Sequence, residues 1–141
     1  MAITERKGLT LLELVVCTLM IGILASAALP LSKNFVRHEK EKLLRDRLCE
    51  VRFAIDRFYQ QKSVAEPGLS DKDYYPKSLQ ELINRRFLRK IPVDPVTGSD
   101  DWALRSSTDG EDAEITDGSN VFDVSSRSNE IGSDGRPYSH W

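Results

Sequence analysis

A single carboxylate, Glu13, stands inside the main apolar stretch of the chain. Residues 9–31 are 23 residues in which Glu13 is the only charged side chain, and Arg6, Lys7 and Gly8 come directly before them. An ionised carboxylate near the middle of a membrane span costs roughly 2.5–3.5 kcal/mol on insertion scales. Because of this cost, a carboxylate in such a position is expected to have a function. The chemistry open to Glu13 is an ion pair with a cationic partner. The alternative is a structural Glu near the membrane interface.

The apolar stretch is long enough to cross a membrane. At about 1.5 Å per residue, a helix over residues 9–31 spans about 35 Å, more than the roughly 30 Å of a hydrocarbon core. A cleaved secretory signal would have a shorter apolar core before a small-residue cleavage site, which residues 25–27 imitate. The better interpretation places processing before the apolar stretch, after Gly8. By the positive-inside tendency, Arg6 and Lys7 stay in the cytoplasm and the C-terminal part crosses the membrane.

The sequence shows no catalytic constellation, and the protein is not expected to be an enzyme. His38 and His140 have no Cys or Ser partner in a motif, and we expect both at the surface. No phosphate-binding loop or metal-ligand spacing occurs, and the acidic residues 109–117 predict a solvated hairpin tip. Basic residues between 37 and 57 alternate with acidic ones, and the chain has 20 Lys and Arg against 22 Asp and Glu. This pattern predicts a solvated helix face, and the charge balance disfavours nucleic-acid binding, so no nucleic-acid partner is expected.

One long helix is predicted from about Leu9 to about Lys62. In its second part, apolar residues recur every three or four positions, which is the stripe of an amphipathic helix; the stripe consists of Leu44, Leu48, Val51, Ile55 and Phe58. Pro30 lacks the N–H that would bind the Ser26 carbonyl, and Gly22 is a poor helix former. The segment between Gly22 and Pro30 is therefore where the helix should bend or melt most easily.

The two cysteines are not expected to form a disulfide. On one continuous helix, Cys17 and Cys49 would lie about 48 Å apart, far beyond the roughly 7 Å that a disulfide allows between Cα atoms. We expect Cys17 to face lipid or a neighbouring helix. For Cys49, a packing position is favoured over an exposed thiol.

The remaining sequence predicts a small α+β domain in which the long helix packs on an antiparallel sheet. Ser78 and Glu81 form a capping box at the start of a short helix over 78–90, with a buried face of Leu79, Leu82, Ile83 and Phe87. Prolines and a glycine predict a rigid connector over 91–98. Strands are expected at 101–106 and 121–126 and as a third short piece at 113–116, and Tyr138 and Trp141 are expected to pin the tail.

Two parts of the sequence resemble a known protein family. The stretch KGLTLLELVVCTLMIGILASAALP resembles the class III signal of type IV pilin-like proteins, with Gly8, Leu9 and Glu13 in register and Gly22 and Pro30 at the family's glycine and proline positions. Residues 75–126 are similar to the G-type major pseudopilin of type II secretion. With Tyr74 before them, they read YYPKSLQELI, then IPVDPVTGSDDWALR and VFDVSS. The connector reads DPVTG where the family often has DPWG, which suggests a divergent branch.

The resemblance implies a type IV pilin-like fold in three segments. These are a cleaved leader at 1–8, a transmembrane and filament-core helix at 9–31, and a periplasmic α+β domain at 32–141. The domain divides into an amphipathic helix at 32–62, a loop and short helix at 63–90, and a connector and sheet at 91–141. The resemblance further implies that a prepilin peptidase cuts between Gly8 and Leu9 and N-methylates Leu9, and that Glu13 pairs with the N-terminal ammonium of a neighbouring subunit.

The implied function is structural. The chain would be a subunit of a helical pseudopilus that drives export of folded proteins across the outer membrane. Its partners would be copies of itself, minor pseudopilins, the prepilin peptidase and an inner-membrane assembly platform with its ATPase, all at the bacterial inner membrane. Two alternatives stay open. One is a major type IV pilin of a surface fibre for adhesion or motility, and the other is a membrane-anchored binding module that never polymerises.

The resemblance also raises calcium as a cofactor. The family's C-terminal loop usually binds calcium through closely spaced acidic residues, whereas this chain offers only Asn129, Glu130 and Asp134 there. Calcium prefers six to eight oxygen ligands, several of them carboxylates. The sequence therefore favours a tail held by packing of Tyr138 and Trp141, without a cofactor.

Overall fold

The computed structural model describes residues 10–110 and 116–141, and the side chains of 27–33 lie outside that description. Gly8, Leu9 and most of the third expected strand at 113–116 therefore fall outside the described residues. The chain divides into two compact units, residues 1–37 and 38–141, which are considered one at a time. The class is α+β: a long N-terminal helix and a small antiparallel sheet, as expected.

Helix α1 runs over Leu11–Ala65 and confirms the predicted long helix. Its first turn is closed by Thr10, whose Oγ1 accepts a hydrogen bond from the Glu13 N–H at 3.2 Å. The backbone stays helical through Gly22 and Pro30. Melting between these two residues remains a prediction.

In the first unit, α1 is apolar on every side. The large apolar side chains between Leu11 and Leu24 are all between 40 and 83 % exposed, and Cys17 is exposed among them. A helix that is apolar all round normally lies inside a protein or a membrane, because water solvates none of its faces well. Across the residues whose side chains are described, no helix combines the length and the hydropathy of a membrane span.

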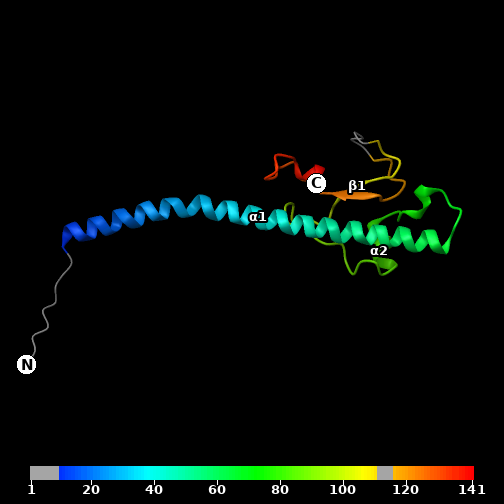
Figure 1. The fold of residues 1–141 in the computed structure, drawn as a ribbon, viewed down its shortest axis with the longest axis horizontal. Helices are drawn as coiled ribbons and strands as arrows, with labels where there is room; N and C mark the ends of the chain where they lie inside the picture. Colours follow the sequence, from blue (N-terminus) through cyan, green and yellow to red (C-terminus); the bar gives the residue numbers. More distant parts are fainter. Residues whose placement is uncertain (1–9, 111–115) are drawn as a thin grey trace, which may run out of the picture. The chain divides into compact units, whose positions relative to one another are not determined.

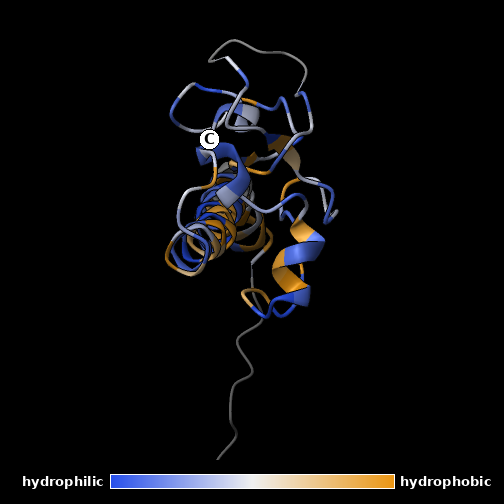
Figure 2. Cartoon of the chain, turned by 90° about the vertical axis from the view of Figure 1, so that its right-hand side faces the viewer, coloured by the Kyte–Doolittle hydropathy of each residue, from blue (hydrophilic) through white to orange (hydrophobic). Residues whose placement is uncertain are grey.

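In the second unit, the predicted apolar stripe of α1 forms the centre of the core. All five of its residues are buried, together with Ala54 between them. The sheet and α2 lie on different sides of this part of α1 (Figure 1), and apolar and polar residues occupy different parts of the circumference of α2 (Figure 2). The other sides of the core come from α2, the sheet and the tail, and include Leu79, Leu82, Trp102, Val121, Val124 and Tyr138. Burying one such side chain fully is worth about 1.5–3 kcal/mol.

Helix α2, Leu79–Asn84, starts as the sequence predicts. The Glu81 N–H donates to Ser78 Oγ at 3.4 Å, while Glu81 Oε2 accepts from the Lys77 N–H at 2.9 Å. The capping box is thus present, with the Glu reaching one residue further back than usual. Leu79 and Leu82 are buried, and Ile83 and Phe87 pack partly buried against the core.

The predicted end of this helix at residue 90 is wrong. Arg86 adopts φ of 65°, the left-handed region. The Phe87 N–H then donates to the Leu82 carbonyl at 2.8 Å and the Arg86 N–H to the Ile83 carbonyl at 2.9 Å. This is a Schellman motif, which ends a helix and is usually signalled by glycine. No glycine stands here, so the sequence pattern gave no reason to stop.

The sheet has two strands, β1 at Ala103–Arg105 and β2 at Asp123–Ser125, paired antiparallel with Leu104 opposite Val124. Both lie inside the predicted strands but are half as long. Beyond β1, the Ser106 N–H turns to the Asp109 carboxylate at 2.7 Å instead of continuing the ladder. Two short 3-10 helices, η1 at Asp71–Tyr74 and η2 at Tyr138–His140, complete the second unit.

Candidate functional site

Glu13 lies in the first turn of α1, where its backbone N–H donates to Thr10 Oγ1, so that Thr10 caps the turn. The Leu14 N–H also donates to the Thr10 carbonyl at 3.1 Å. A carboxylate at this position faces the positive end of the helix dipole, which is worth up to about 1 kcal/mol. The T-x-x-E pattern was available in the sequence and gives Glu13 a local role in addition to the expected ion pair. The Leu9 ammonium that would form that pair lies outside the described residues.

Small residues mark one face of the apolar segment. Thr18, Gly22 and Ser26 follow each other at intervals of four and line a groove of about 500 Å³ with Val15, Leu19 and Ile23. The Thr18 hydroxyl donates to the Leu14 and Val15 carbonyls, and the Ser26 hydroxyl donates to the Ile23 carbonyl at 2.8 Å. Because these hydroxyls are satisfied within the helix, the groove suits close packing in apolar surroundings.

In the second unit, two charged residues of α1 do not lie on a solvated face as predicted. Arg52 is half-buried, and its guanidinium donates to Asp123, to the Val124 carbonyl and to the Trp141 carbonyl. Glu41 is only 2 % exposed. Its carboxylate accepts from the Ser133 N–H at 2.8 Å, from the Ser133 hydroxyl at 2.5 Å and from the Tyr138 hydroxyl at 3.0 Å.

The burial of Glu41 could have been predicted from the sequence. It stands three residues before Leu44, so it extends the buried stripe by one step. A carboxylate at a stripe position requires donors opposite it, because an unpaired buried charge is very costly. The predicted intra-helix pairing holds for Arg47 and Glu50, whose side chains meet at 3.0 Å in solvent.

The connector 91–98 is the rigid turn that its prolines predict. Asp94 is fully buried, and its carboxylate accepts from the Val96 N–H at 2.7 Å and from the Ser126 hydroxyl at 2.6 Å. The indole N–H of the buried Trp102 donates to the Pro92 carbonyl at 2.9 Å. The connector is thus fastened both to the residue after β2 and to the residue before β1.

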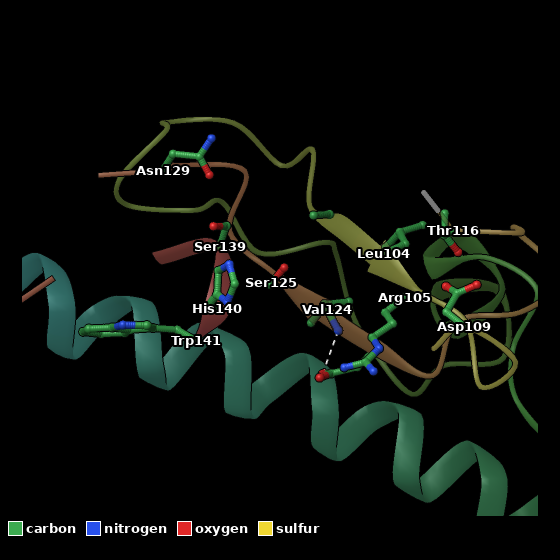
Figure 3. Close-up of a pocket in the computed structure, with 12 residues that line it drawn as sticks. Leu104, Arg105, Asp109, Thr116, Val124, Ser125, Asn129, Ser139, His140 and Trp141 are labelled. Carbon is green, nitrogen blue, oxygen red and sulfur yellow. Dashed lines mark hydrogen bonds between the residues drawn. The ribbon is translucent and has the colours of Figure 1, made fainter. Parts of the chain in front are cut away.

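A hollow of about 670 Å³ lies between the sheet and the tail (Figure 3). Its wall includes Arg105, Asp109, Asn129, His140 and Trp141. The residue types include serine, histidine and aspartate, so a hydrolytic arrangement has to be considered. However, Asp123 accepts from Arg52 and from the Val124 N–H, and Asp109 accepts from the Ser106 and Asp117 N–H groups.

Within the described parts of the chain, no hydrogen bond links His140 to a serine or a carboxylate. A nucleophile and its base need such a bond at about 2.6–3.2 Å. Of the carboxylates at the hollow, Asp109 braces the backbone, and Asp123 holds Arg52 and the Val124 N–H.

Asp109 and Asp117, at the two ends of the acidic segment, also accept hydrogen bonds from residues close to them in the sequence. Backbone N–H groups of Asp117 and Ser106 lower the pKa of Asp109, and the Thr108 hydroxyl followed by the Ser119 N–H lowers that of Asp117. Asp117 is exposed, in agreement with the predicted solvated tip, whereas Asp109 is half-buried.

The two candidate calcium ligands do not come together. Asn129 lines the 670 Å³ hollow, whereas Asp134 lines a different hollow of about 250 Å³. Both oxygens of Asp134 bind Arg136: Oδ1 accepts from its N–H at 3.0 Å, and Oδ2 lies 2.9 Å from its guanidinium. The N–H of Arg136, followed by its guanidinium, lowers the pKa of Asp134. Residues 10–110 and 116–141 contain no group of three or more acidic, His or Cys side chains able to hold a metal. This donor set does not fit calcium.

Both cysteines are free and exposed. The expected packing position of Cys49 is therefore wrong in the single chain. Cys49 follows Leu48 directly, and one residue turns an α-helix by about 100°, so it leaves the buried stripe. It faces the 250 Å³ hollow beside Arg45.

No protein-family model, no characterised protein and no solved structure matches the chain. What the chain does has to be inferred from its own residues and their geometry.

Proposed function

We propose that the chain is a structural, non-enzymatic subunit of a pilin-like helical filament, the pseudopilus of a type II secretion system, which drives export of folded proteins across the outer membrane. One observation carries the proposal. Between Leu11 and Leu24, α1 exposes large apolar side chains on all sides, with Glu13 as its single charge. Such a surface needs lipid or other apolar helices around it, and it needs a cation for the carboxylate.

Before assembly, the precursor is anchored in the inner membrane through residues 9–31, with Arg6 and Lys7 in the cytoplasm and the α+β domain in the periplasm. The internally bonded hydroxyls of Thr18 and Ser26 support this placement, because hydrocarbon offers no other hydrogen-bond partner. A prepilin peptidase then cuts between Gly8 and Leu9 and N-methylates Leu9. The new ammonium belongs to the residue four positions before Glu13 in the sequence.

In the filament, the apolar helices pack against each other in the core. Glu13 pairs with the ammonium of a neighbouring subunit, so a helix that slides out of register leaves both charges unpaired. The groove along Thr18, Gly22 and Ser26 allows a neighbouring helix to approach closely, which offsets the loss of lipid contact. Melting between Gly22 and Pro30 lets each helix adapt to its neighbours.

The α+β domain faces outward. An inner-membrane platform with its ATPase extracts subunits from the membrane, and minor pseudopilins complete the filament. The charged, exposed residues on the outer face of α1, such as Arg47 and Glu50, suit this solvated position.

The test compares a strain lacking this gene with its parent and with a complemented strain. Loss of folded exoproteins from the medium, with surface fibres intact and export restored on complementation, is the expected result. Unchanged secretion with missing surface fibres would identify a surface pilin instead. Unchanged secretion together with unchanged fibres would contradict any filament role and leave a membrane-anchored module.

A further inference from the structure

The C-terminal tail is fastened to one side of α1. Three residues of that helix reach it: Glu41 binds Ser133 and Tyr138, Arg45 stacks on Trp141, and Arg52 binds the Trp141 carbonyl. The three α1 residues are four and seven positions apart, spacings that keep them on one face of an α-helix. Figure 1 shows the tail beside this part of α1.

The carboxylate of Glu41 lies where the tail supplies hydrogen-bond donors. Glu41 is 2 % exposed and receives three hydrogen bonds from the tail. His38 Nδ1 lies 3.8 Å from Glu41 Oε2, the oxygen that also accepts from the Ser133 hydroxyl. A carboxylate that accepts several hydrogen bonds of this kind is well compensated for its burial. Closing the tail onto α1 therefore needs no additional ion at this point.

The carboxylate of Asp134, in the tail itself, is surrounded by positively charged groups and N–H groups. Asp134 is paired with Arg136, and both line the 250 Å³ hollow together with Arg45 and Arg52. The Trp141 Nε1–H approaches Asp134 and helps to lower its pKa without reaching hydrogen-bond geometry. The Arg45 guanidinium lies 4.3 Å from the centre of the Trp141 ring. A divalent cation entering this hollow would meet one carboxylate, that of Asp134, which is already paired with Arg136 and lies among guanidinium groups and an indole N–H. Calcium prefers six to eight oxygen ligands, several of them carboxylates.

We propose that this chain holds its C-terminal loop closed without the calcium ion that its resemblance implies. Two sets of contacts take the place of that ion: the hydrogen bonds of Glu41 with Ser133 and Tyr138, here called the Glu41 clasp, and the Asp134–Arg136 ion pair. Folding of residues 129–141 is then independent of divalent cations. The inference concerns the folded second unit alone, so it holds or fails separately from the proposed filament.

The first experiment uses the purified full chain in detergent micelles. Thermal unfolding is followed by Trp fluorescence in millimolar CaCl2 and in EDTA, and Tb³⁺ is titrated as a calcium surrogate whose emission an adjacent Trp sensitises. The expected result is the same unfolding midpoint in both solutions and no saturable sensitised emission. A calcium-dependent rise of the midpoint by several degrees, or saturable Tb³⁺ emission that calcium displaces, would overturn the proposal.

The second experiment tests the clasp itself. Tyr138→Phe removes one donor to Glu41 while keeping the ring, and Glu41→Gln removes the charge. Glu39→Gln, on an exposed residue of the same helix, is the matched control. Both clasp variants should lower the midpoint by about 4 °C or more, equally in calcium and in EDTA, while the control leaves it unchanged. If neither clasp variant lowers the midpoint, or if calcium restores it, the clasp does not close the loop.

Discussion

Arg52 and Asp123 lie 71 positions apart in the sequence and form a two-point ion pair, with Arg52 Nε 2.6 Å from Oδ1 and a terminal nitrogen 3.4 Å from Oδ2. The same guanidinium donates to the Val124 carbonyl at 3.0 Å and to the Trp141 carbonyl at 2.8 Å. One side chain of α1 thus joins the helix to β2 and to the tail. A planar fork of donors suits this task better than an ammonium does.

Replacing Arg52 should therefore destabilise the second unit. In Arg52→Gln we expect a loss of about 1–3 kcal/mol in the free energy of unfolding, because bonds from a charged donor are lost and Asp123 keeps its charge unpaired. The value stays modest because both side chains are about one-third exposed. The measurement is thermal or urea unfolding of the full chain in detergent, followed by Trp fluorescence.

Arg47→Gln is the matched control for Arg52→Gln. Arg47 lies on the same helix but pairs with Glu50 in solvent, so its replacement should change the unfolding free energy by less than about 0.5 kcal/mol. Equal effects of the two substitutions would mean that the contacts of Arg52 with the sheet and the tail contribute nothing to stability.

Gly132 gives a second prediction, since it leaves no room for a side chain. A Cβ at this position would lie 2.5 Å from Trp141 Cζ2 and 3.0 Å from Asp134 Oδ1. Gly132→Ala should therefore push the indole away from the loop and cost about 1–3 kcal/mol. The Trp emission should move to the red in the folded state, because Trp141 gains solvent while Trp102 stays buried.

Gly110→Ala serves as the control for Gly132→Ala. A Cβ at Gly110 would meet no heavy atom within 4 Å, so neither stability nor emission should change. An unshifted Trp spectrum in Gly132→Ala would show that the tail packs differently from the arrangement described above.

Sequence reasoning succeeded where side-chain periodicity decides the structure. The apolar stripe of α1 is buried at every predicted position, and the pattern Ser78-x-x-Glu81 marks the true start of α2. It failed where a residue adopts a conformation or makes a contact that is unusual for its type. Arg86 ends α2 in a conformation typical of glycine. Because arginine has a high helix propensity, the helix was predicted to continue to residue 90.

The charged residues of α1 show the same limit. Arg52 lies among the charged residues of a predicted solvated face. The spacing of Glu41 continues the apolar stripe, but the partners that hold Glu41 and Arg52 lie 71 to 97 positions away. Long-range partners of this kind cannot be identified from a local pattern. By contrast, Asp94 was recognisable as part of a rigid connector, because its prolines lie beside it in the sequence.

Tyr59 gives a prediction that depends on pH. Its hydroxyl donates to Asp71 Oδ1 at 2.6 Å. That hydrogen bond, with smaller contributions from burial and from the charge of Asp71, raises the pKa of Tyr59 from 10.0 to about 12. Since the folded pKa lies above the ordinary value, the stabilising effect of this bond is fully present below pH 10.0 and disappears as the pH rises through about 12.

Tyr59 can be observed by subtracting the phenolate absorbance titration of Tyr59→Phe from that of the parent chain. The difference curve should have its midpoint near pH 12. In an Asp71→Asn background the midpoint should move down toward the ordinary tyrosine value, because a neutral amide accepts a weaker hydrogen bond from the hydroxyl than the carboxylate does and the neighbouring charge is gone. Asp73→Asn, in the same 3-10 helix, should leave it in place. A parent midpoint near the ordinary value would mean that Tyr59 and Asp71 are not hydrogen-bonded in solution.

Glu13 gives the prediction that bears most directly on the proposed filament. Two roles are open to its side chain: accepting a bond from the Thr10 N–H, which would complete a capping box, and the ion pair with a neighbouring subunit. Gln performs well in a capping box but carries no charge. Glu13→Gln therefore separates the two roles, whereas Glu13→Ala removes both.

If the ion pair matters, Glu13→Gln and Glu13→Ala should both reduce assembled filament by at least about tenfold, because an unpaired ammonium in an apolar core costs several kcal/mol. Filaments released from the periplasm by opening the outer membrane are pelleted and quantified by immunoblot against the membrane-extracted pool. Glu50→Gln, on the exposed face of α1, is the control and should assemble normally. N-terminal sequencing must show that the variants still begin at Leu9, so that a defect in cleavage is not mistaken for one in assembly. Normal filament yield from Glu13→Gln with a reduced yield from Glu13→Ala would assign Glu13 to capping alone, since only the charge distinguishes Gln from Glu at that position.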